Sequence, residues 1–502
     1  MKLDAILDGI DFRADGDISN IEVSGLACDS RAVQAGDMFV AFRGYAEDGY
    51  SYISDAAAKG ARVILAEKDF EAGRSITKII VKETRTALPA IAANFYGHPE
   101  RSLKIIGVTG TNGKTTVTYI IENILKAKGS GAGVIGTINY RLKEKVTPAK
   151  NTTPGPIELE SIFRDMVQDG LEYAVMEVSS HSLDQHRVDG VSFDAAIFTN
   201  ITNEHLDYHK TPGEYLKAKT KIFERLKEDG FAILNKDDMK IASLRASIKR
   251  KIISYGIKED ALIMARDIRL TLDGTGFVIT TPEGPIEINT KLIGMHNVSN
   301  ILAAVAAAFI LNIDLDVIKN GVETTKSVPG RLEPLDAGQP YKIFVDYAHT
   351  EDALNKILSL LKGIAGNKII TVFGCGGNRD KTKRPLMGKA ACRFSDHVII
   401  TSDNPRFEDP LEIISEIERG VKWSFSNYGI IPDRRDAIAK ALATASKGDI
   451  VVIAGKGHEN YQIIGDKVMP FNDREAALDI LRKKGYGPRA LLKAGAVEEG
   501  AG

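Results

Sequence analysis

A glycine-rich loop between a short apolar run and an amphipathic helix constrains this chain more than any other feature of its sequence. Residues 105–108 are apolar, and residues 114–128 repeat apolar side chains at helical spacing. Backbone N–H groups of such a loop, placed at a helix N-terminus, form a natural site for anions. The junction therefore predicts a phosphate-binding loop at the start of an α/β unit.

The loop itself reads VTGTNGKTT and predicts an ATP site. Lys114 is expected to neutralise the β- and γ-phosphates, and the Thr115 hydroxyl to bind Mg²⁺. The common pattern has a glycine six residues before the lysine, where this chain has Val108 between Gly107 and Gly110. We predict a loop of related design and different spacing, rather than an ordinary tight turn. Its expected ATP contacts are Gly110, Thr111, Asn112, Gly113, Lys114, Thr115 and Thr116.

Strand-like and helical patterns alternate through most of the chain, whose 502 residues suffice for about three domains. Apolar runs lie at residues 37–42, 62–66, 79–82, 134–138, 173–178, 195–199, 231–234, 343–345, 368–373, 397–401 and 449–454. Helical patterns at 87–96 and 301–311 are among those between them. Such alternation predicts parallel sheets with helices on both faces. We expect an α/β fold of three domains, 1–100, 101–328 and 329–502, with a central phosphate-loop-type parallel sheet and a C-terminal Rossmann-like domain.

Polar motifs follow each of the four strands expected in the third domain. They read DYAHT, GCGGNRD, SDNPR and GKGHE. Ligands of open α/β sheets bind outside the carboxyl ends of the strands. The four motifs therefore predict one edge of a binding site.

Composition excludes several classes of function. The formal net charge of -1 and the lack of a basic stripe argue against nucleic acid as a partner. The longest apolar run, residues 301–311, is shorter than the roughly 20 residues of a membrane span. Three cysteines without C-x-x-C spacing, and three aspartates among the first eleven residues, predict a cytoplasmic chain without a zinc site or secretory signal. The small, acidic tail at 494–502 is expected to be disordered.

Further motifs accompany the loop in a fixed order. They are EVSSHSLDQHRV at 177–188, NITNEHLDYH at 200–209, GMHNVSNILAA at 294–304, VPGRLE at 328–333, DYAHT at 346–350 and DNPR at 403–406. With this set the chain resembles the Mur ligase family, and within it the tripeptide-synthesising members. The resemblance runs from DSR at 29–31 to GKGHE at 455–459. One departure is Glu351, where the family usually has proline.

The resemblance implies a division of labour among the three domains. The first would hold the uridine nucleotide of UDP-N-acetylmuramoyl-L-alanyl-D-glutamate, the second ATP, and the third the incoming amino acid. ATP would phosphorylate a carboxylate of the D-glutamate, and the amine would attack the acyl phosphate. Such chemistry needs metal and cationic stabilisation of moving phosphate charge rather than a Ser or Cys nucleophile. We expect a monomeric enzyme.

Four residues are expected to carry the catalysis: Lys114, Glu177, His205 and Lys219. By resemblance, Glu177 shares Mg²⁺ with Thr115, and His205 serves a second Mg²⁺. The plainer reading of Glu177 is a surface acid at a strand end. A zinc helix built from His205 and His209 is disfavoured, because the H-E-x-x-H order is missing. His209 is expected to be a capping or surface histidine.

Lys219 is expected to be modified. By resemblance it reacts with CO₂ to give N6-carboxylysine, an anion with two hard oxygens suited to Mg²⁺. The plainer reading is a solvated helix lysine, and we expect that for Lys217 and Lys221.

Other residues are expected by resemblance to bind the substrates. The contacts to the UDP-muramoyl dipeptide would be Ser30, Arg31, Asn151, Thr152, Thr153, Ser179, Gln185 and Arg187. Outside the loop, the contacts to ATP would be His296, Asn297, Arg331, Asp346, Tyr347 and His349. Lone polar residues in loops are usually only solvated, which is the alternative for each.

The DNPR motif indicates which amino acid arrives. By resemblance, the form with arginine goes with meso-diaminopimelate, which carries one more carboxylate than lysine. The guanidinium of Arg406 suits that carboxylate bidentately, and lysine would leave it unpaired. Asp403 and Asn404 are expected to hold the distal ammonium, and Arg379, Gly455 and Glu459 to complete the pocket. The alternatives are a structural Arg406, a lysine-adding or cyanophycin-type ligase, a non-catalytic nucleotide-binding protein, and a nucleic-acid-dependent ATPase.

Overall fold

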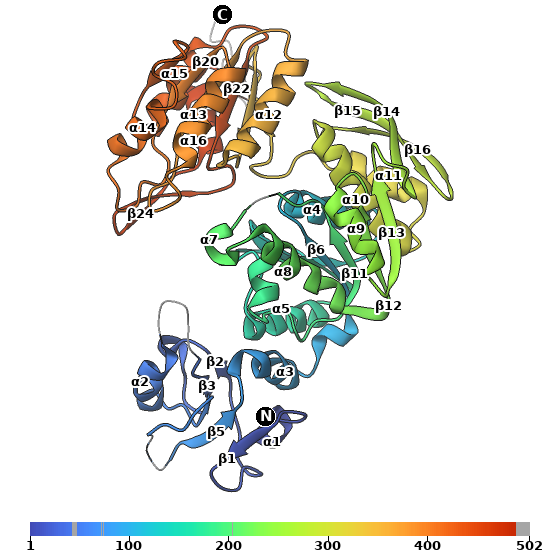
Figure 1. Cartoon of the computed structure of the whole chain (residues 1–502), viewed down its shortest axis with the longest axis vertical. Coiled ribbons are helices and arrows are strands. Elements are labelled where there is room, and N and C mark those ends of the chain that lie inside the picture. The colour runs from blue at the N-terminus through green and yellow to red at the C-terminus, as the bar shows by residue number, and fades with distance from the viewer. Residues whose placement is uncertain (43–47, 72, 74, 203, 488–502) are drawn as a thin grey trace, which may run out of the picture. The chain divides into compact units, whose positions relative to one another are not determined.

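The computed structural model describes residues 1–42, 48–71, 73, 75–202 and 204–487 and divides into two compact units (Figure 1). Unit 1 comprises Met1–Ile268, Gly276–Asn289 and Met295–Thr325, and unit 2 comprises Arg269–Thr275, Thr290–Gly294 and Lys326–Gly502. The predicted border near residue 100 falls inside unit 1, so the exact domain boundaries stay a prediction. The tail at 494–502 lies outside the described residues.

The N-terminal part of unit 1 forms its own sheet. Its order over the described residues is β1-β5-β4-β3-β2, parallel except for β1 against β5. A core around Leu65, Ile79 and Ile91 joins this sheet to α3. The elements are α1 (Leu3–Ile6), β1 (Phe12–Ala14), β2 (Leu26–Ala27), η1 (Ser30–Ala32), β3 (Met38–Val40), η2 (Gly49–Tyr52), α2 (Ile53–Ala58), β4 (Val63–Ala66), β5 (Thr77–Val81), α3 (Thr84–Tyr96) and η3 (Pro99–Ser102).

The central sheet begins with the strand before the phosphate loop. Its order over the described residues is β16-β15-β14-β13-β12-β11-β6-β10-β7-β8-β9. Its strands are β6 (Lys104–Thr109), β7 (Ala132–Ile135), β8 (Asn139–Leu142), β9 (Lys145–Pro148), β10 (Tyr173–Glu177), β11 (Phe193–Phe198), β12 (Leu226–Asn235), β13 (Lys251–Gly256), β14 (Ile263–Thr271), β15 (Gly274–Thr281) and β16 (Gly284–Thr290).

The strands predicted for this sheet are confirmed, but the sheet is not purely parallel. The pairs from β7 through β10, β6, β11, β12 and β13 to β14 are parallel, whereas β8 lies antiparallel to β7 and β9. Sequence analysis missed β8, β9 and β13–β16. Strands β14 and β16 alternate buried and exposed residues along much of their length, so they lack the continuous apolar run of a strand buried on both faces.

Helices cover both faces of the central sheet (Figure 1). Helices α4, α10 and α11 pack against one another, while α5, α6 and α8 share a separate core with the strands, around Phe163, Leu183 and Ile222. The helices of unit 1 beyond residue 103 are α4 (Lys114–Ala127), α5 (Pro156–Gln168), α6 (Ser180–Asp184), α7 (Leu206–His209), α8 (Pro212–Glu224), α9 (Met239–Ser243), η4 (Leu244–Ala246), α10 (Met295–Ile310) and α11 (Leu315–Glu323).

Unit 2 is a doubly wound sheet, as predicted. Its order over the described residues is β17-β18-β22-β19-β20-β21, and only β17 is antiparallel to its neighbour. One core joins α12 and α13 to the sheet, and another joins α15 and α16. The elements are β17 (Glu333–Leu335), β18 (Lys342–Asp346), α12 (Glu351–Ile364), β19 (Ile369–Phe373), α13 (Lys383–Phe394), β20 (His397–Ile400), α14 (Pro410–Glu418), β21 (Tyr428–Ile430), α15 (Arg434–Thr444), β22 (Ile450–Ala454), β23 (Tyr461–Ile464), β24 (Lys467–Pro470) and α16 (Asp473–Lys483).

Glu351 lies in the first turn of α12, where an acidic side chain is favourable. The hydroxyl of Thr350 caps this helix by accepting from the Ala353 N–H, and Glu351 and Asp352 lie in its first turn. Acidic residues stabilise a helix N-terminus through its dipole. The departure from the usual proline therefore leaves the start of the helix intact.

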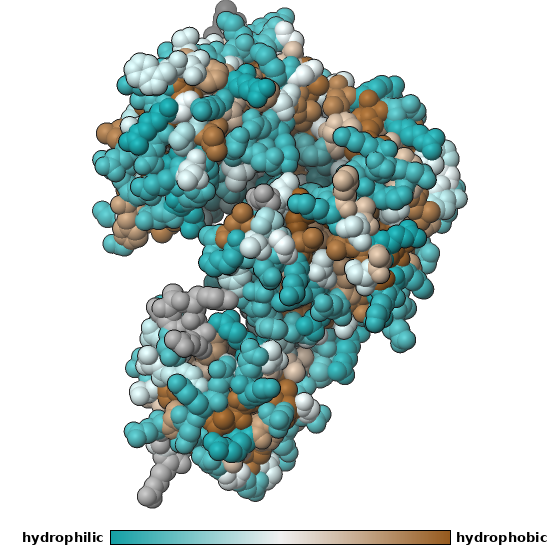
Figure 2. Space-filling view, viewed as in Figure 1, coloured by the Kyte–Doolittle hydropathy of each residue, from teal (hydrophilic) through white to brown (hydrophobic). Residues whose placement is uncertain are grey.

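The surface is mostly hydrophilic on the face shown in Figure 2, with apolar side chains scattered over it. Among the described residues, no helix has the length and apolar content to cross a membrane.

A buried acidic pair in unit 1 predicts a pH-dependent stability. Glu160 of α5 is 2% exposed, and burial, followed by the charge of Glu100, raises its pKa to about 9. The carboxyl group therefore binds a proton in the folded chain that it releases near pH 4.5 when unfolded. The stability from this proton is complete below about pH 4.5 and is lost as pH rises towards 9, by at most about 1.4 kcal/mol per pH unit.

Replacing Glu160 with glutamine removes this dependence without removing the hydrogen-bonding side chain. We expect Glu160→Gln to be more stable than the parent at pH 8, with the difference shrinking towards pH 5. Urea unfolding at both values measures it, with exposed Glu172→Gln as the control. A difference that is equal at both pH values would contradict the raised pKa of Glu160.

Candidate functional site

Two glycines set the path of the phosphate loop. Gly110 and Gly113 have φ angles of 140° and 90°, which L side chains rarely adopt. A Cβ at Gly110 would lie 1.9 Å from Thr199 Oγ1, and a Cβ at Gly113 would lie 2.3 Å from Asn300 Oδ1. The unusual spacing of the loop thus corresponds to a tight fit against its neighbours.

Asn200 holds the outer part of the loop and was missed by sequence analysis. Its side chain accepts from Asn112 N and donates to Asn112 O, both at 3.0 Å. Its carbonyl accepts from Thr111 N at 2.8 Å, and Thr199 Oγ1 donates to Asn112 O at 2.6 Å. These bonds occupy the outer backbone groups of the loop and fix its shape before any ligand arrives.

Two lysine side chains converge on one carbonyl of the loop. Lys114 Nζ donates to Gly110 O at 2.9 Å and to Thr111 O at 3.0 Å, and Lys219 Nζ donates to Gly110 O at 2.8 Å. Lys219 is 2% exposed, so it is not a solvated helix lysine. Burial, and then the charge of Lys114, holds the pKa of Lys219 well below its usual value. On the same helix, Lys217 is exposed, as expected.

Glu177 lies at the end of β10 and faces the loop. It is 1% exposed, so the surface-acid reading is wrong. Its Oε1 accepts from Thr115 Oγ1 and Thr137 N, and its Oε2 accepts from Thr137 Oγ1, each at 2.9 Å. A buried carboxylate beside a hydroxyl offers hard oxygen donors, which fit Mg²⁺ bound through one or two carboxylates together with phosphates and water.

His205 belongs to an aromatic group beside Lys219. The rings of His205 and His181 lie 4.8 Å apart between centroids, and His205 and Tyr215 lie 6.2 Å apart. Lys219 Nζ lies 4.8 Å from the centroid of the Tyr215 ring. Burial lowers the pKa of His205, and the charges of Lys114 and Lys219 act in the same direction. The ring is therefore neutral at physiological pH, the form that binds metals.

His209 has a structural role. It is buried rather than on the surface, and its Nε2 lies 3.0 Å from Ser180 Oγ. In the part of the chain that the structure describes, no group of three or more His, Cys, Asp or Glu side chains is arranged to hold a metal.

The residues expected to bind the dipeptide come together around Thr153. Its hydroxyl donates to Glu177 O at 2.9 Å and accepts from Ser179 N at 3.1 Å. Arg187 donates to Thr153 O at 3.1 Å and, through two nitrogens, to Gln185 Oε1 at 2.6 and 3.1 Å. These four positions form one surface next to the carboxylate of Glu177.

Thr152 and Asn151 lie at the edge of the same surface. Thr152 Oγ1 lies 3.1 Å from Thr137 Oγ1, whose other contact is Glu177. The carbonyl of Asn151 accepts from the Tyr140 hydroxyl at 2.8 Å. Thr137, which precedes β8, and Tyr140 of β8 therefore tie both residues to the loop region.

The two residues expected to hold the uridine nucleotide differ in exposure. Ser30 is buried, and its carbonyl accepts from Lys59 Nζ at 2.9 Å. Arg31 is exposed and pairs with Asp29 at 2.8 Å. A cavity of about 500 Å³ opens beside this turn, and its lining includes Cys28, Asp29, Ala32, Leu88, Tyr96 and Ile157.

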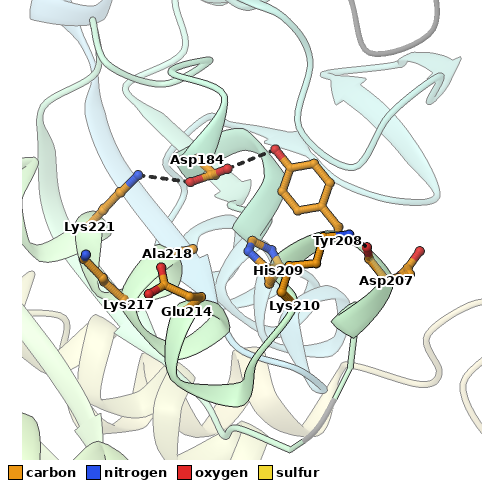
Figure 3. Close-up of a pocket in the computed structure, with 9 residues that line it drawn as sticks. All are labelled: Asp184, Asp207, Tyr208, His209, Lys210, Glu214, Lys217, Ala218 and Lys221. Atoms are coloured by element: carbon orange, nitrogen blue, oxygen red, sulfur yellow. Dashed lines mark hydrogen bonds and ion pairs between the residues drawn. The ribbon is translucent and has the colours of Figure 1, made fainter.

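A second cavity of about 720 Å³ lies between α6, α7 and α8 (Figure 3). Asp184 lines this cavity and accepts hydrogen bonds from two other lining residues, from the Tyr208 hydroxyl at 2.9 Å and from Lys221 Nζ at 3.2 Å. Lys217 and Glu214 line the opposite wall. None of the residues expected to bind a substrate lines this cavity.

The residues expected to bind ATP outside the loop are divided between the units. His296 and Asn297 lie in the first turn of α10 in unit 1, where Asn300 Nδ2 donates to Asn297 Oδ1 at 3.2 Å. Because Asn300 also borders Gly113, this turn adjoins the phosphate loop. Asn300 is a second loop contact that sequence analysis missed.

Four further ATP candidates meet at the carboxyl end of β18 in unit 2. The Arg331 guanidinium lies 5.0 Å from the Tyr347 ring centroid, and the rings of Tyr347 and His349 lie 4.6 Å apart. Asp346 accepts from Leu332 N at 2.6 Å and from Ala348 N at 2.7 Å. Asp346 thus joins the two loops that present Arg331 and Tyr347, a positioning role beside the expected contact.

The guanidinium of Arg406 lies beside the glycine-rich loop after β19. Its Nη1 donates to Gly377 O at 2.8 Å and Asn404 O at 3.4 Å. Among the described residues, its Nε and Nη2 have no hydrogen-bond partner, which leaves one edge of the fork for a carboxylate. A Cβ at Gly376 would lie 3.0 Å from Arg406 Nη1 and 3.9 Å from Arg379 Cγ, so Arg379 lies nearby.

The remaining amino-acid candidates also meet in unit 2. Asn404 Nδ2 donates to Glu459 Oε2 at 2.8 Å. A Cβ at Gly455 would lie 2.8 Å from Asp403 Oδ2. Asp403 and Asn404 are buried, whereas Glu459 is partly open to solvent. The structure therefore brings together the candidates from the DNPR and GKGHE motifs.

Comparison with protein families accounts for most of the chain. The Mur ligase family catalytic domain matches residues 22–96, the Mur ligase middle domain residues 108–308, and the Mur ligase glutamate ligase domain residues 330–457. A UDP-N-acetylmuramoyl-L-alanyl-D-glutamate–2,6-diaminopimelate ligase of Caldanaerobacter subterraneus is 42% identical over 481 residues, covering 96% of this chain and 99% of the relative. A Bacillus licheniformis protein of the same name is 44% identical over 469 residues, covering 92% and 94%.

Solved structures agree with these relatives. A structure of a UDP-N-acetylmuramoyl-L-alanyl-D-glutamate–2,6-diaminopimelate ligase has 32% identity and a TM-score of 0.70, covering 97% of this chain and 99% of its own. A MurF ligase from Thermotoga maritima in complex with ADP has 22% identity and a TM-score of 0.65, covering 93% and 98%. The latter similarity concerns the fold alone.

Proposed function

The chain belongs to the Mur ligase family, and we propose that it is the ATP-dependent ligase joining meso-diaminopimelate to UDP-N-acetylmuramoyl-L-alanyl-D-glutamate in peptidoglycan precursor synthesis. One observation carries the proposal: the phosphate loop, the buried Glu177 carboxylate and the dipeptide candidates around Thr153 adjoin one another. The Nε and Nη2 edge of the Arg406 guanidinium would bind the distal carboxylate of diaminopimelate and so select this amino acid over lysine.

Glu177 and the Thr115 hydroxyl would hold Mg²⁺ beside the phosphates, and His205 and Lys219 would hold a second ion. When bound, the metal would neutralise negative charge on the transferring phosphoryl group. The chain itself contributes two features to phosphate binding: the fixed backbone of the phosphate loop and the ammonium group of Lys114. Both are in place before the substrates bind, because Asn200 and Gly110 already fix the backbone.

The buried environment of Lys219 supports its carbamylation. Attack on CO₂ requires the neutral amine, which forms a new N–C bond and releases a proton. Burial, and then the charge of Lys114, holds the pKa of Lys219 well below its usual value, which favours that neutral amine. The resulting anion would form an ion pair with Lys114, whereas an ammonium group at Lys219 would be repelled by the Lys114 charge.

The reaction runs in two steps. A carboxylate oxygen of the D-glutamate attacks the γ-phosphorus of ATP, giving an acyl phosphate and ADP. The amine of diaminopimelate then attacks the acyl carbon, and phosphate leaves from the tetrahedral intermediate. Arg187, anchored on Gln185, would orient the substrate carboxylate, and Arg406 would hold the distal carboxylate of the amine.

We further propose that the enzyme acts in the cytoplasm as a monomer. Cys28, Cys375 and Cys392 are free thiols, which suits a reducing compartment. All the predicted contact residues come from one chain, so the proposed reaction needs no second copy.

Release of phosphate tests the proposed function. With ATP, Mg²⁺ and the UDP-muramoyl dipeptide, we expect release to depend on meso-diaminopimelate and to be at least about a hundredfold slower with L-lysine, since a site built for a polar contact rejects analogues lacking it. Omitting the dipeptide is the control. A preference for L-lysine would identify the lysine-adding alternative instead.

A further inference from the structure

A buried ammonium group lies under the amino-acid candidates of unit 2 and takes no part in the steps above. Lys456 directly follows Gly455, and its side chain is 0% exposed. Its Nζ lies 3.2 Å from Asn404 Oδ1 and 3.1 Å from Glu459 Oε2. A buried cation is costly unless it is paired and hydrogen-bonded, and here both partners are residues expected to contact diaminopimelate.

These contacts fix which way the Asn404 amide faces. Its Oδ1 accepts from Lys456 Nζ and from Ile463 N, the latter at 3.0 Å. Both partners are donors only, so the oxygen and nitrogen of this amide cannot be exchanged. The nitrogen then points to Glu459 Oε2 at 2.8 Å. Asn404 is left as a donor, and the carboxylates of Asp403 and Glu459 are the acceptors for an ammonium group.

We propose that Lys456 is a positioning residue for amino-acid selection. It holds the Asn404 amide in one orientation and anchors one oxygen of Glu459, so that donor and acceptor face the incoming amino acid in a fixed pattern. Without the ammonium group, the amide keeps only the Ile463 N–H as a partner for its oxygen. The amide is then held less firmly in this orientation and can more easily present oxygen where nitrogen is needed.

This role differs from that of the other buried cations in unit 2. Arg384 pairs with Glu408 and Glu416, and Arg434 pairs with Asp473, none of which is expected to touch a substrate. Lys456 alone among these three contacts two predicted ligand-binding side chains. Its effect should therefore appear in amino-acid binding before it appears in folding.

Steady-state kinetics of Lys456→Met test the proposal, which rests on the proposed function. Methionine fills the space without the charge. We expect KM for meso-diaminopimelate to rise at least about tenfold, because two charge-assisted hydrogen bonds that orient its partners are lost. KM for ATP and for the UDP-muramoyl dipeptide should change less than about twofold. Lys467→Met, on exposed β24, is the matched control.

A double-mutant cycle separates positioning from a merely structural role. Because Lys456 is proposed to act partly through the Asn404 amide, the KM increase of the double variant should be smaller than the product of the increases caused by Lys456→Met and Asn404→Ala. Multiplying effects, or an unchanged KM in a folded variant, would overturn the proposal. If Lys456→Met does not fold, the neutral Lys456→Gln replaces it with the same expectations. A parent enzyme that makes no product with meso-diaminopimelate would instead refute the proposed function.

Discussion

Replacing Lys219 with alanine is expected to lower kcat by about 10²–10³-fold, the range seen when one electrostatic contact to a transition state is removed. The loss is expected whether Lys219 is a carbamate or an ammonium group in the parent enzyme. As the carbamate it would hold metal, and as an ammonium it would only contact Gly110 O. KM for diaminopimelate should change little, because Lys219 is not among the residues expected to bind that amino acid.

The carbamate makes a prediction that a plain ammonium does not. Truncation leaves a buried space beside Lys114 where a small carboxylate fits, so acetate or formate should restore part of the activity of Lys219→Ala. Exposed Lys217→Ala, on the same helix, should keep the parent activity. A loss that no carboxylate reverses, together with an unmodified mass for the intact parent, would contradict the carbamate.

Replacing Arg406 with alanine is expected to raise KM for meso-diaminopimelate by roughly 10²–10³-fold, since truncating one partner of a desolvated charge pair costs about 2–5 kcal/mol. The half-buried guanidinium is held by Gly377 O through one nitrogen, which leaves its other edge for the distal carboxylate. Lysine lacks that carboxylate and should lose much less, so the preference between the two amino acids should nearly vanish.

Initial rates with both amino acids measure this preference. Arg406→Lys keeps the charge but loses the planar fork, and we expect it to recover only part of the selectivity. Arg419→Ala, exposed at the end of α14, is the control. If Arg406→Ala kept its preference for diaminopimelate, Arg406 would be a structural arginine and the choice of amine would lie elsewhere.

Much of the fold was predictable because the buried strands of the two parallel sheets are short apolar runs. The runs at 105–108, 173–178 and 449–454 correspond to β6, β10 and β22. The antiparallel edge β8–β9 was not predictable, because its hairpin follows β7 within a few residues and its exposed residues break the apolar pattern. Periodicity identifies strands buried on both faces better than edge strands.

The candidate site was predictable where a motif carries its own chemistry. Lys114, Glu177 and Arg406 stand out because a lysine in a glycine loop, an acid ending an apolar strand and an arginine after a strand have few ordinary roles. Asn200 and Lys456 were not predictable from their residue types. Their importance comes from partners 88 and 52 residues away in the chain.

The orientation of Asn404 shows the same limit. The sequence predicts an amide beside the distal ammonium, and an amide offers both a donor and an acceptor. Only the contacts of Lys456 and the Ile463 N–H to its oxygen show that the donor side of the amide faces Glu459. The chemistry of a polar side chain is therefore fixed by neighbours that a motif does not display.

Transfer of a carboxylate oxygen from the D-glutamate to phosphate distinguishes an acyl phosphate from simple hydrolysis of ATP. The UDP-muramoyl dipeptide would carry ¹⁸O in the carboxylates of its D-glutamate and react with ATP and meso-diaminopimelate, and mass spectrometry would follow phosphate and product. We expect one ¹⁸O in each released phosphate and one lost from each amide product, because the acyl phosphate breaks between the acyl carbon and its bridging oxygen. Unlabelled phosphate without an amide product would contradict this expectation.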